Sequence, residues 1–124
     1  MVDVDFSKII VLLMPFVPNN WEKIIFMVYY FDGGYEMKFY VKNSNGVYSD
    51  YHDLIKSKAT LFQLFQEINK IIRKTRNELS NNHLWHTMTI VYQSNNQFCA
   101  DFDYQDAGDD LVSYIGRWKE KYLI

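Results

Sequence analysis

Residues 21–51 read WEKIIFMVYYFDGGYEMKFYVKNSNGVYSDY, and this stretch decides the fold. Two apolar runs flank Gly33-Gly34, a glycine pair typical of a two-residue β-hairpin turn. With that turn, three apolar pairs face each other across the two strands: Tyr30 with Met37, Val28 with Phe39, and Phe26 with Val41. Because side chains alternate along a strand, this register gives both strands one shared apolar face. The stretch therefore predicts an antiparallel hairpin with one face in the core.

The opposite face of the first strand is more apolar than a solvated face requires. Its residues are Ile25, Met27, Tyr29 and Phe31. We expect this row to be covered, either by the N-terminal helix or by a second copy of the chain. Beyond the second strand, Asn45-Gly46 predicts another turn, which leads to a short third strand near residues 47–51.

Two helices are predicted around this region by apolar residues that recur with the helical period. The first is short, with apolar positions Phe6, Ile9, Ile10 and Leu13, a possible N-cap at Asp3 or Asp5, and prolines at positions 15 and 18 that end it. The second follows a capping-box pattern at Thr60–Gln63 and continues for about five turns to Leu79.

A second hairpin is predicted in LWHTMTIVYQSNNQFCADFDY, residues 84–104. A three-residue loop at positions 94–96 aligns Met88, Ile90 and Tyr92 with Phe98, Ala100 and Phe102, whereas a two-residue loop would mix the faces. The other face then carries Trp85, Thr87, Thr89, Cys99, Asp101 and Asp103. A final helix follows, with one apolar stripe formed by Leu111, Tyr114, Ile115, Trp118 and Tyr122.

The predicted elements follow the order α-βββ-α-ββ-α. Tight turns join antiparallel strands, so we expect an α+β fold with an antiparallel sheet of about five strands and helices packed on it. A chain of 124 residues is long enough for one core, and we expect a single domain over residues 1–124.

Composition narrows the classes of function. Hydrophobic residues make up 48% of the chain and its net charge is only -2, which is atypical of disordered, nucleic-acid-binding or membrane-surface proteins. The apolar run at residues 9–17 is too short to span a bilayer, and no signal-peptide pattern surrounds it. Cys99 is the only cysteine, so no internal disulfide can form. We expect a soluble, cytoplasmic protein.

The charge is distributed unevenly along the chain. Residues 77–116 contain no lysine or arginine but contain Glu78 and five aspartates, a net charge of -6. The remainder holds 13 basic and 9 acidic residues, a net charge of about +4. A partner attracted by long-range electrostatics would therefore be basic and would meet the C-terminal half.

The aspartates lie within CADFDYQDAGDD, residues 99–110. Asp101 and Asp103 could begin a calcium-binding loop, but that pattern fails at Gln105, Asp106 and Val112. We therefore predict no metal and no cofactor. For the later aspartates, capping of the final helix and contact with a basic partner both stay open.

Catalysis has little support in the sequence. Cys99 with His83 or His86 could form a thiol–imidazole pair, and His52 lies beside Asp53. However, the strand carboxylates lie on a polar face where nothing predicts the desolvation that acid–base chemistry exploits. No nucleophile elbow, phosphate-binding loop or dinucleotide fingerprint occurs. We predict that the chain is not an enzyme.

Several stretches together resemble the YezG-like family of bacterial immunity proteins. They are Trp21-Glu22-Lys23-Ile24, Tyr29-Tyr30, Phe39-Tyr40-Val41-Lys42, Asn45-Gly46, Tyr51-His52-Asp53, Trp85-x-Thr87, Phe102-Asp103-Tyr104 and Arg117-Trp118-Lys119-x-Lys121-Tyr122-Leu123. Each is weak alone, but the ordered series runs from about Trp21 to Leu123. The resemblance implies a non-enzymatic antitoxin that stays in the cytoplasm and neutralises the C-terminal domain of a secreted or contact-delivered toxin, such as a nuclease.

This resemblance agrees with the charge distribution, because a nuclease must hold phosphates with lysine and arginine. We therefore expect the partner-binding residues to be Asp101, Asp103, Tyr104, Asp106, Asp109, Asp110, Trp85, Tyr51, His52 and Asp53. Inhibition could cover the active site of the toxin or a neighbouring surface. The alternative function is a non-enzymatic adaptor or chaperone for a secreted effector.

Overall fold

A computed structural model of the chain describes residues 4–79, 83–106 and 110–124. The helices in these residues are α1 (Phe6–Leu13), α2 (Tyr51–Leu54), α3 (Lys58–Arg76) and α4 (Leu111–Tyr122), with a 3-10 turn at Met14–Phe16. The strands are β1 (Trp21–Phe31), β2 (Gly34–Asn43), β3 (Tyr48–Asp50), β4 (Thr87–Gln93) and β5 (Phe98–Asp103). They form one antiparallel sheet in the order β3-β2-β1-β4-β5. The predicted α+β class is confirmed.

The first hairpin has its predicted faces but a different register. Phe31 pairs with Gly34 and Phe26 with Phe39, so the turn is Asp32-Gly33 and the predicted pairing was wrong by two residues. Of the two glycines, Gly33 adopts the positive φ of +88° that the turn requires, whereas Gly34 lies in the strand beneath the Phe31 ring. Because side chains alternate with a period of two, the two-residue shift leaves each side chain on its predicted face.

The second hairpin has the predicted register. Met88 pairs with Phe102, Ile90 with Ala100 and Tyr92 with Phe98 across a loop of three residues. Asn96 closes this loop with a positive φ of 71°, a conformation that asparagine tolerates better than most residues.

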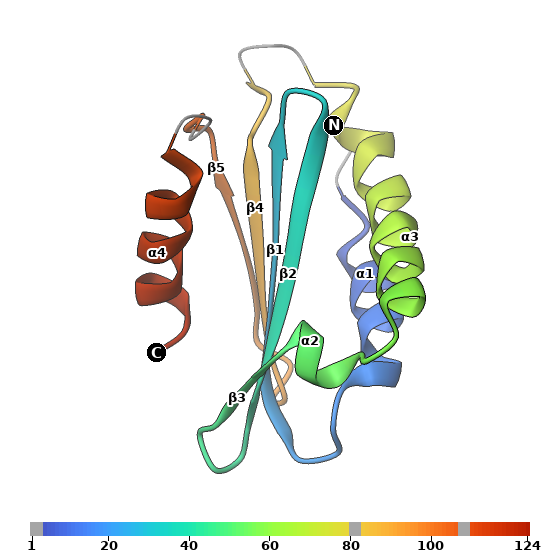
Figure 1. The fold of residues 1–124 in the computed structure, drawn as a ribbon, viewed down its shortest axis with the longest axis vertical. Helices are drawn as coiled ribbons and strands as arrows, with labels where there is room; N and C mark the ends of the chain where they lie inside the picture. The colour runs from blue at the N-terminus through green and yellow to red at the C-terminus, as the bar shows by residue number, and fades with distance from the viewer. Residues whose placement is uncertain (1–3, 80–82, 107–109) are drawn as a thin grey trace.

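Two helices cover one face of the sheet, and one helix covers the other (Figure 1). The face beneath α1 and α3 carries the larger core, in which Phe26, Val28 and Phe39 of the central strands meet Leu13 and Ile68 of the helices. Asp5 caps α1 by accepting a hydrogen bond from the backbone N–H of Lys8, as one of the two predicted N-caps. The positions of α1 and α3 thus follow from their apolar stripes.

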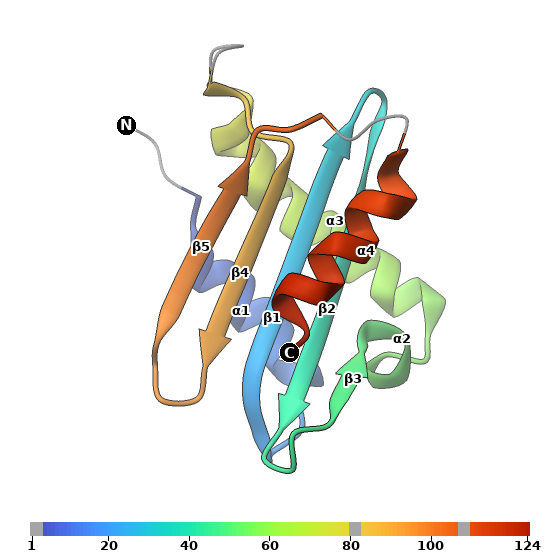
Figure 2. The same cartoon turned by 90° about the vertical axis from the view of Figure 1, so that its left-hand side faces the viewer.

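The other face is covered by α4, which lies along β1 and β2 (Figure 2). Its stripe contributes Tyr114 and Trp118 to a second cluster that contains Ile25, Met27 and Tyr29 of β1. Three residues of the outer row of β1 are therefore covered by the C-terminal helix, whereas Phe31 at the end of the strand is 41% exposed. The expected cover, an N-terminal helix or a second copy, was wrong because the stripe of α4 is the apolar surface that reaches this face.

Three further expectations need correction. Ser57, and not Thr60, caps α3: the Thr60 backbone N–H donates to the Ser57 side chain at 3.2 Å, which places Thr60 inside the first turn. Residues 51–54 form α2, where a strand end was predicted, because the Asp50 and Asp53 side chains form a capping box. Trp85 lies on the α1/α3 side, since the regular alternation of β4 begins only at Thr87.

Candidate partner-binding surface

Two of the predicted acidic residues lie on β5, the edge strand farthest from β3. Asp101 and Asp103 belong to β5, and Tyr104, Gln105 and Asp106 continue from its end. Asp110 precedes the first turn of α4. Asp109, also predicted at this surface, lies outside the described residues. The structure therefore places Asp101 and Asp103 on the edge strand, Asp106 beside the turn between β1 and β2, and Asp110 at the start of α4.

Asp101 and Asp103 point toward α4, where two tyrosines meet them. The Tyr122 hydroxyl donates to Asp101 Oδ2 and the Tyr114 hydroxyl to Asp103 Oδ2, both at 2.7 Å. A third polar contact lies nearby, since the Trp118 indole N–H donates to Thr89 Oγ1 at 2.9 Å. These aspartates thus fasten α4 to the sheet, a role that the sequence analysis missed.

One signal in the sequence could have indicated this role. Tyr114 and Tyr122 stand eight residues apart, about two helical turns, so they share a helix face. Asp101 and Asp103 stand two residues apart on a strand and therefore share a sheet face. A pair of phenols facing a pair of carboxylates across the same interface predicts hydrogen bonds between them.

The two phenols remain protonated at neutral pH. Burial raises the pKa of Tyr114, with a smaller contribution from the hydrogen bond to Asp103, and together they bring it to about 12. Burial also raises the pKa of Tyr122 well above its usual value, with a second contribution from Asp101. Each hydroxyl is therefore a hydrogen-bond donor to its carboxylate.

The charges on this edge are not neutralised by ion pairs. Within the described residues, salt bridges join Lys8 to Asp5 and Lys70 to Glu67, and neither Asp101 nor Asp103 takes part in one. Arg117 and Lys121 do line the same groove of about 270 Å³ between α4 and β5, so the groove itself is of mixed charge. Asp101 is exposed at the edge, and Asp106 and Asp110 are exposed near the β1–β2 turn and the start of α4.

The later aspartates that the structure describes differ in their contacts. Asp110 occupies the N-cap position of α4, but its side chain makes no capping hydrogen bond. Asp106 instead accepts a hydrogen bond from the Tyr29 hydroxyl at 3.2 Å. Of the two interpretations left open, the structure therefore gives no support to capping of α4 by the Asp110 side chain.

The predicted aromatic residues differ sharply in exposure. Tyr104 is 56% exposed, beside Phe102 at 39%, so both present aromatic surface next to the aspartates. Trp85 is only 3% exposed and packs against Tyr30 and Phe102, while the Arg76 guanidinium donates two hydrogen bonds to its carbonyl. In this conformation Trp85 builds the core and offers no surface to a partner.

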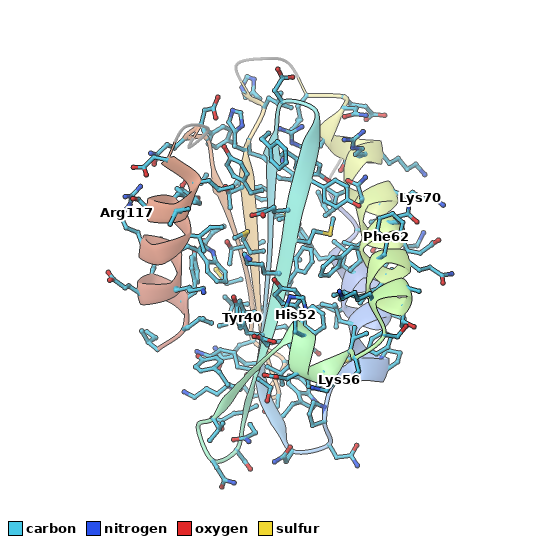
Figure 3. All side chains as sticks on the ribbon, viewed as in Figure 1. Tyr40, His52, Lys56, Phe62, Lys70 and Arg117 are labelled. Carbon is cyan, nitrogen blue, oxygen red and sulfur yellow. The ribbon has the colours of Figure 1, made fainter. Side chains whose placement is uncertain are left out.

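Tyr51, His52 and Asp53 lie in α2, next to the opposite edge strand, β3. Tyr51 is half-buried against Phe39 and Phe65, and His52 is exposed with its ring 4.2 Å from the Tyr51 ring (Figure 3). These residues are separated from the acidic edge by the width of the sheet. The predicted set thus divides into an acidic group at β5 and a separate aromatic group at α2.

The described residues offer little for catalysis or metal binding. Cys99 is exposed, and its thiol points to Asp101 Oδ1 at 3.6 Å. Burial and the neighbouring Asp101 raise the pKa of this thiol, which disfavours the nucleophilic thiolate. No group of three histidine, cysteine or acidic residues in this part of the chain is placed to hold a metal ion. None of the helices described is long and apolar enough to cross a membrane.

The fold and this surface define a small α+β protein with an acidic, aromatic sheet edge. The chain belongs to the family of YezG-like immunity proteins, whose family model matches residues 4–123, nearly the whole chain. The resemblance carried by the aromatic and turn motifs is therefore confirmed. No match was found among curated proteins.

Proposed function

We propose that the chain is an antitoxin that binds and neutralises a cognate toxin, and that this toxin is a nuclease with a basic substrate groove. Membership of the immunity protein family carries this proposal. The acidic edge at β5 supports the choice of toxin class, because lysine and arginine in a phosphate-binding groove would complement Asp101, Asp103 and Asp106.

The inhibition is non-catalytic. The toxin's C-terminal domain docks on the β5 edge inside the cytoplasm of the producing cell, and the carboxylates occupy the place of substrate phosphates. Tyr104 and Phe102 supply exposed aromatic surface at the same edge, where aromatic contacts often dominate binding energy. The α2 group, Tyr51 with His52 and Asp53, is a second and separate candidate contact.

Rescue of growth tests the function itself. Cells that express the toxin encoded beside this chain should survive when the chain is co-expressed and die when it is absent. An adaptor or chaperone would not rescue growth, so death in both cultures would contradict the antitoxin proposal. Co-purification of the two products would then identify the inhibited species.

Association kinetics test the acidic edge. The double variant Asp101→Asn/Asp103→Asn keeps oxygen acceptors for both tyrosines but removes two charges, and we expect association with the toxin domain to slow by about tenfold at low salt. A matched control, Glu22→Gln/Glu67→Gln, removes two exposed charges elsewhere and should leave the rate near that of the wild type. Equal rates for the two variants would contradict the proposed role of the edge.

A further inference from the structure

The two edges of the sheet are exposed to different degrees. The edge strand β3 has three residues and leads directly into α2, so it offers little backbone to a new strand. The other edge strand, β5, has six residues and pairs with β4 without a bulge. It contains no proline and no lysine, two common means of blocking an edge. Of the two, β5 is therefore the edge able to accept another strand.

The register shows which backbone groups of β5 are free to pair. The Gln93 N–H donates to the Gln97 carbonyl at 2.9 Å, so this is a hydrogen-bonded pair, and such pairs recur at every second position. The backbone N–H and C=O groups of Cys99 and Asp101 therefore point toward β4. The N–H and C=O groups of Phe98, Ala100 and Phe102 consequently face away from β4. Among the described strands none lies on that side.

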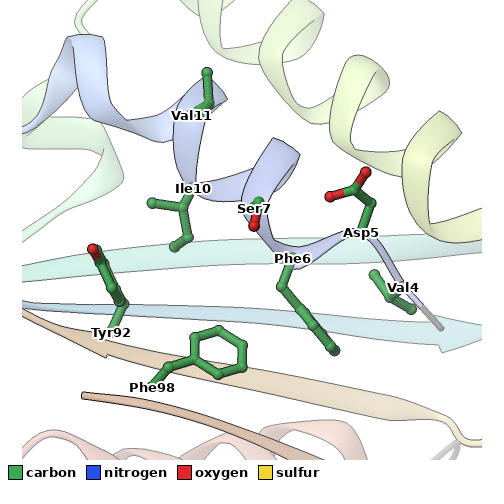
Figure 4. Close-up of a pocket in the computed structure, with 8 residues that line it drawn as sticks. All are labelled: Val4, Asp5, Phe6, Ser7, Ile10, Val11, Tyr92 and Phe98. Carbon is green, nitrogen blue, oxygen red and sulfur yellow. The ribbon is translucent and has the colours of Figure 1, made fainter. Parts of the chain in front are cut away.

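An apolar groove runs along the α1 side of this edge. It has a volume of about 580 Å³ and is lined by Phe6, Ile10, Val11, Tyr92 and Phe98, among others (Figure 4). The Phe6 and Phe98 rings lie 5.2 Å apart, and Phe98 and Val11 are 45% and 68% exposed. A strand added to β5 would direct every second side chain to this face, where the groove favours apolar residues.

The α4 side of the same edge carries the two aspartates of β5, with Arg117 and Lys121 of α4 lining the groove beside them. Cys99, Asp101 and Asp103 alternate with the groove-facing residues, so side chains of an added strand on this face would lie beside two aspartates. Antiparallel pairing of two copies of β5 would bring their aspartate rows together, and like charges across a strand pair are destabilising. Charge thus favours a basic strand over a second copy of the chain.

We infer that β5 binds an extended segment of the toxin as a sixth strand, in which apolar side chains facing the α1 groove alternate with lysine or arginine facing Asp101 and Asp103. This inference rests on the proposed function and specifies how the partner is held. Backbone hydrogen bonds to Phe98, Ala100 and Phe102 provide affinity, and the alternating faces provide specificity.

A proline at position 100 tests the edge directly. Ala100→Pro removes an N–H that faces away from β4, so the β4–β5 ladder keeps its bonds while the outward edge loses a donor. Ala100→Ser retains the N–H and is the matched control. We expect Ala100→Pro to weaken toxin binding by tenfold or more, on the order of one lost hydrogen bond plus a steric block, and Ala100→Ser to bind like the wild type.

Hydrogen exchange provides a measurement that needs no variant. In the free chain the amides of Phe98, Ala100 and Phe102 face solvent and should exchange rapidly. In the complex with the toxin domain they should become protected, whereas the exposed loop amides at Asn45 and Gly46 should not change. Unchanged exchange at the three β5 amides in the complex would overturn the inference, even if Ala100→Pro failed to fold.

Failure of the inference and failure of the proposed function give different results. If the wild type and a folded Ala100→Pro variant rescue growth and bind equally, the edge inference is wrong and the antitoxin function stands. If the wild type does not rescue growth, a peptide of alternating valine and lysine, acetylated and amidated at its ends, tests the edge alone. Binding that protects the three β5 amides supports the inference, and equal binding by a valine–glutamate peptide contradicts it.

Sedimentation of the free chain tests the rival occupant. A monomer agrees with a basic strand as the occupant of β5. A dimer that dissociates in Ala100→Pro and persists in Ala100→Ser would assign this edge to a second copy and overturn the inference.

Discussion

The two faces of the sheet are closed by different chemistry. Under α1 and α3, the contacts of the core are largely apolar, with Phe26, Phe39 and Ile68 fully buried. Under α4, an apolar cluster is bordered by hydrogen bonds from Tyr114 and Tyr122 to carboxylates. The comparison shows that both faces combine burial with hydrogen bonds, since the Tyr30 hydroxyl donates to Asn69 and Arg76 donates to the Trp85 carbonyl under α3. The α4 face differs because the acceptors of its tyrosines are carboxylates of the edge strand β5.

The first prediction concerns the α1/α3 face and has the largest expected effect. Phe26→Ala removes a fully buried ring from the central strand, and we expect it to lower the free energy of unfolding by about 3–5 kcal/mol. Phe62→Ala is the matched control, because Phe62 is 62% exposed on α3 and should cost about 0.5 kcal/mol or less. Urea unfolding of both variants measures the difference, and similar costs would contradict the assignment of this core.

Alkaline pH should weaken the packing of α4, and Tyr30, whose pKa is also raised by burial, extends the effect to the α1/α3 face. Tyr114 titrates near pH 12 in the folded protein but near pH 10 when unfolded, so between these values the unfolded state binds fewer protons. The contribution of Tyr114 to the free energy of unfolding is therefore fully present below pH 10, and it falls as the pH rises toward 12. Buried Tyr40 has its pKa raised to about 12 as well and adds to the loss. Unfolding midpoints that stay constant from pH 9 to pH 11 would contradict this coupling.

The Tyr114–Asp103 contact should contribute more than a neutral hydrogen bond. Tyr114→Phe removes the hydroxyl and leaves a half-buried carboxylate without that donor, at an expected cost of about 1.5–3 kcal/mol. A double-mutant cycle with Asp103→Ala, which removes the acceptor, isolates the pair. A coupling energy near zero would show that the contact holds α4 only through packing.

Tyr122→Phe should have the smallest effect of the set. Its acceptor, Asp101, is exposed to water, so we expect a cost of about 0.5–1 kcal/mol. Near the C-terminus, the amides of the last turn of α4 should also exchange faster, while those of β1 remain unchanged. If Tyr122→Phe lost more stability than Tyr114→Phe, this ranking of the two hydrogen bonds would be wrong.

Sequence reasoning was most successful where a repeating pattern met a strong physical constraint. The second hairpin was predicted in register, because a slip of one residue would have exposed Met88 and Ile90. The first hairpin was misplaced by two residues, since Asp32-Gly33 and Gly33-Gly34 both serve as turns and both preserve the faces. Periodicity therefore determined which side chains share a face, whereas the choice between the two neighbouring turns required the backbone conformation of the structure.

The candidate surface was harder to predict. Asp101 and Asp103 were placed on the correct face, but their partners on α4 are distant in sequence, and no local pattern shows which face the last helix covers. Trp85 was misplaced because it precedes the strand and does not follow its alternation. The free edge of β5 depends on strand order, which the sequence pattern left undetermined.

The two strand carboxylates are each held at both oxygens. Asp103 accepts the Gln105 backbone N–H on Oδ1 and the Tyr114 hydroxyl on Oδ2, and Asp101 contacts the Cys99 thiol on Oδ1 and the Tyr122 hydroxyl on Oδ2. Their side-chain torsions are already restricted in the free protein. A cation that docks beside them therefore removes little rotamer entropy, and the negative charges act as fixed points in space.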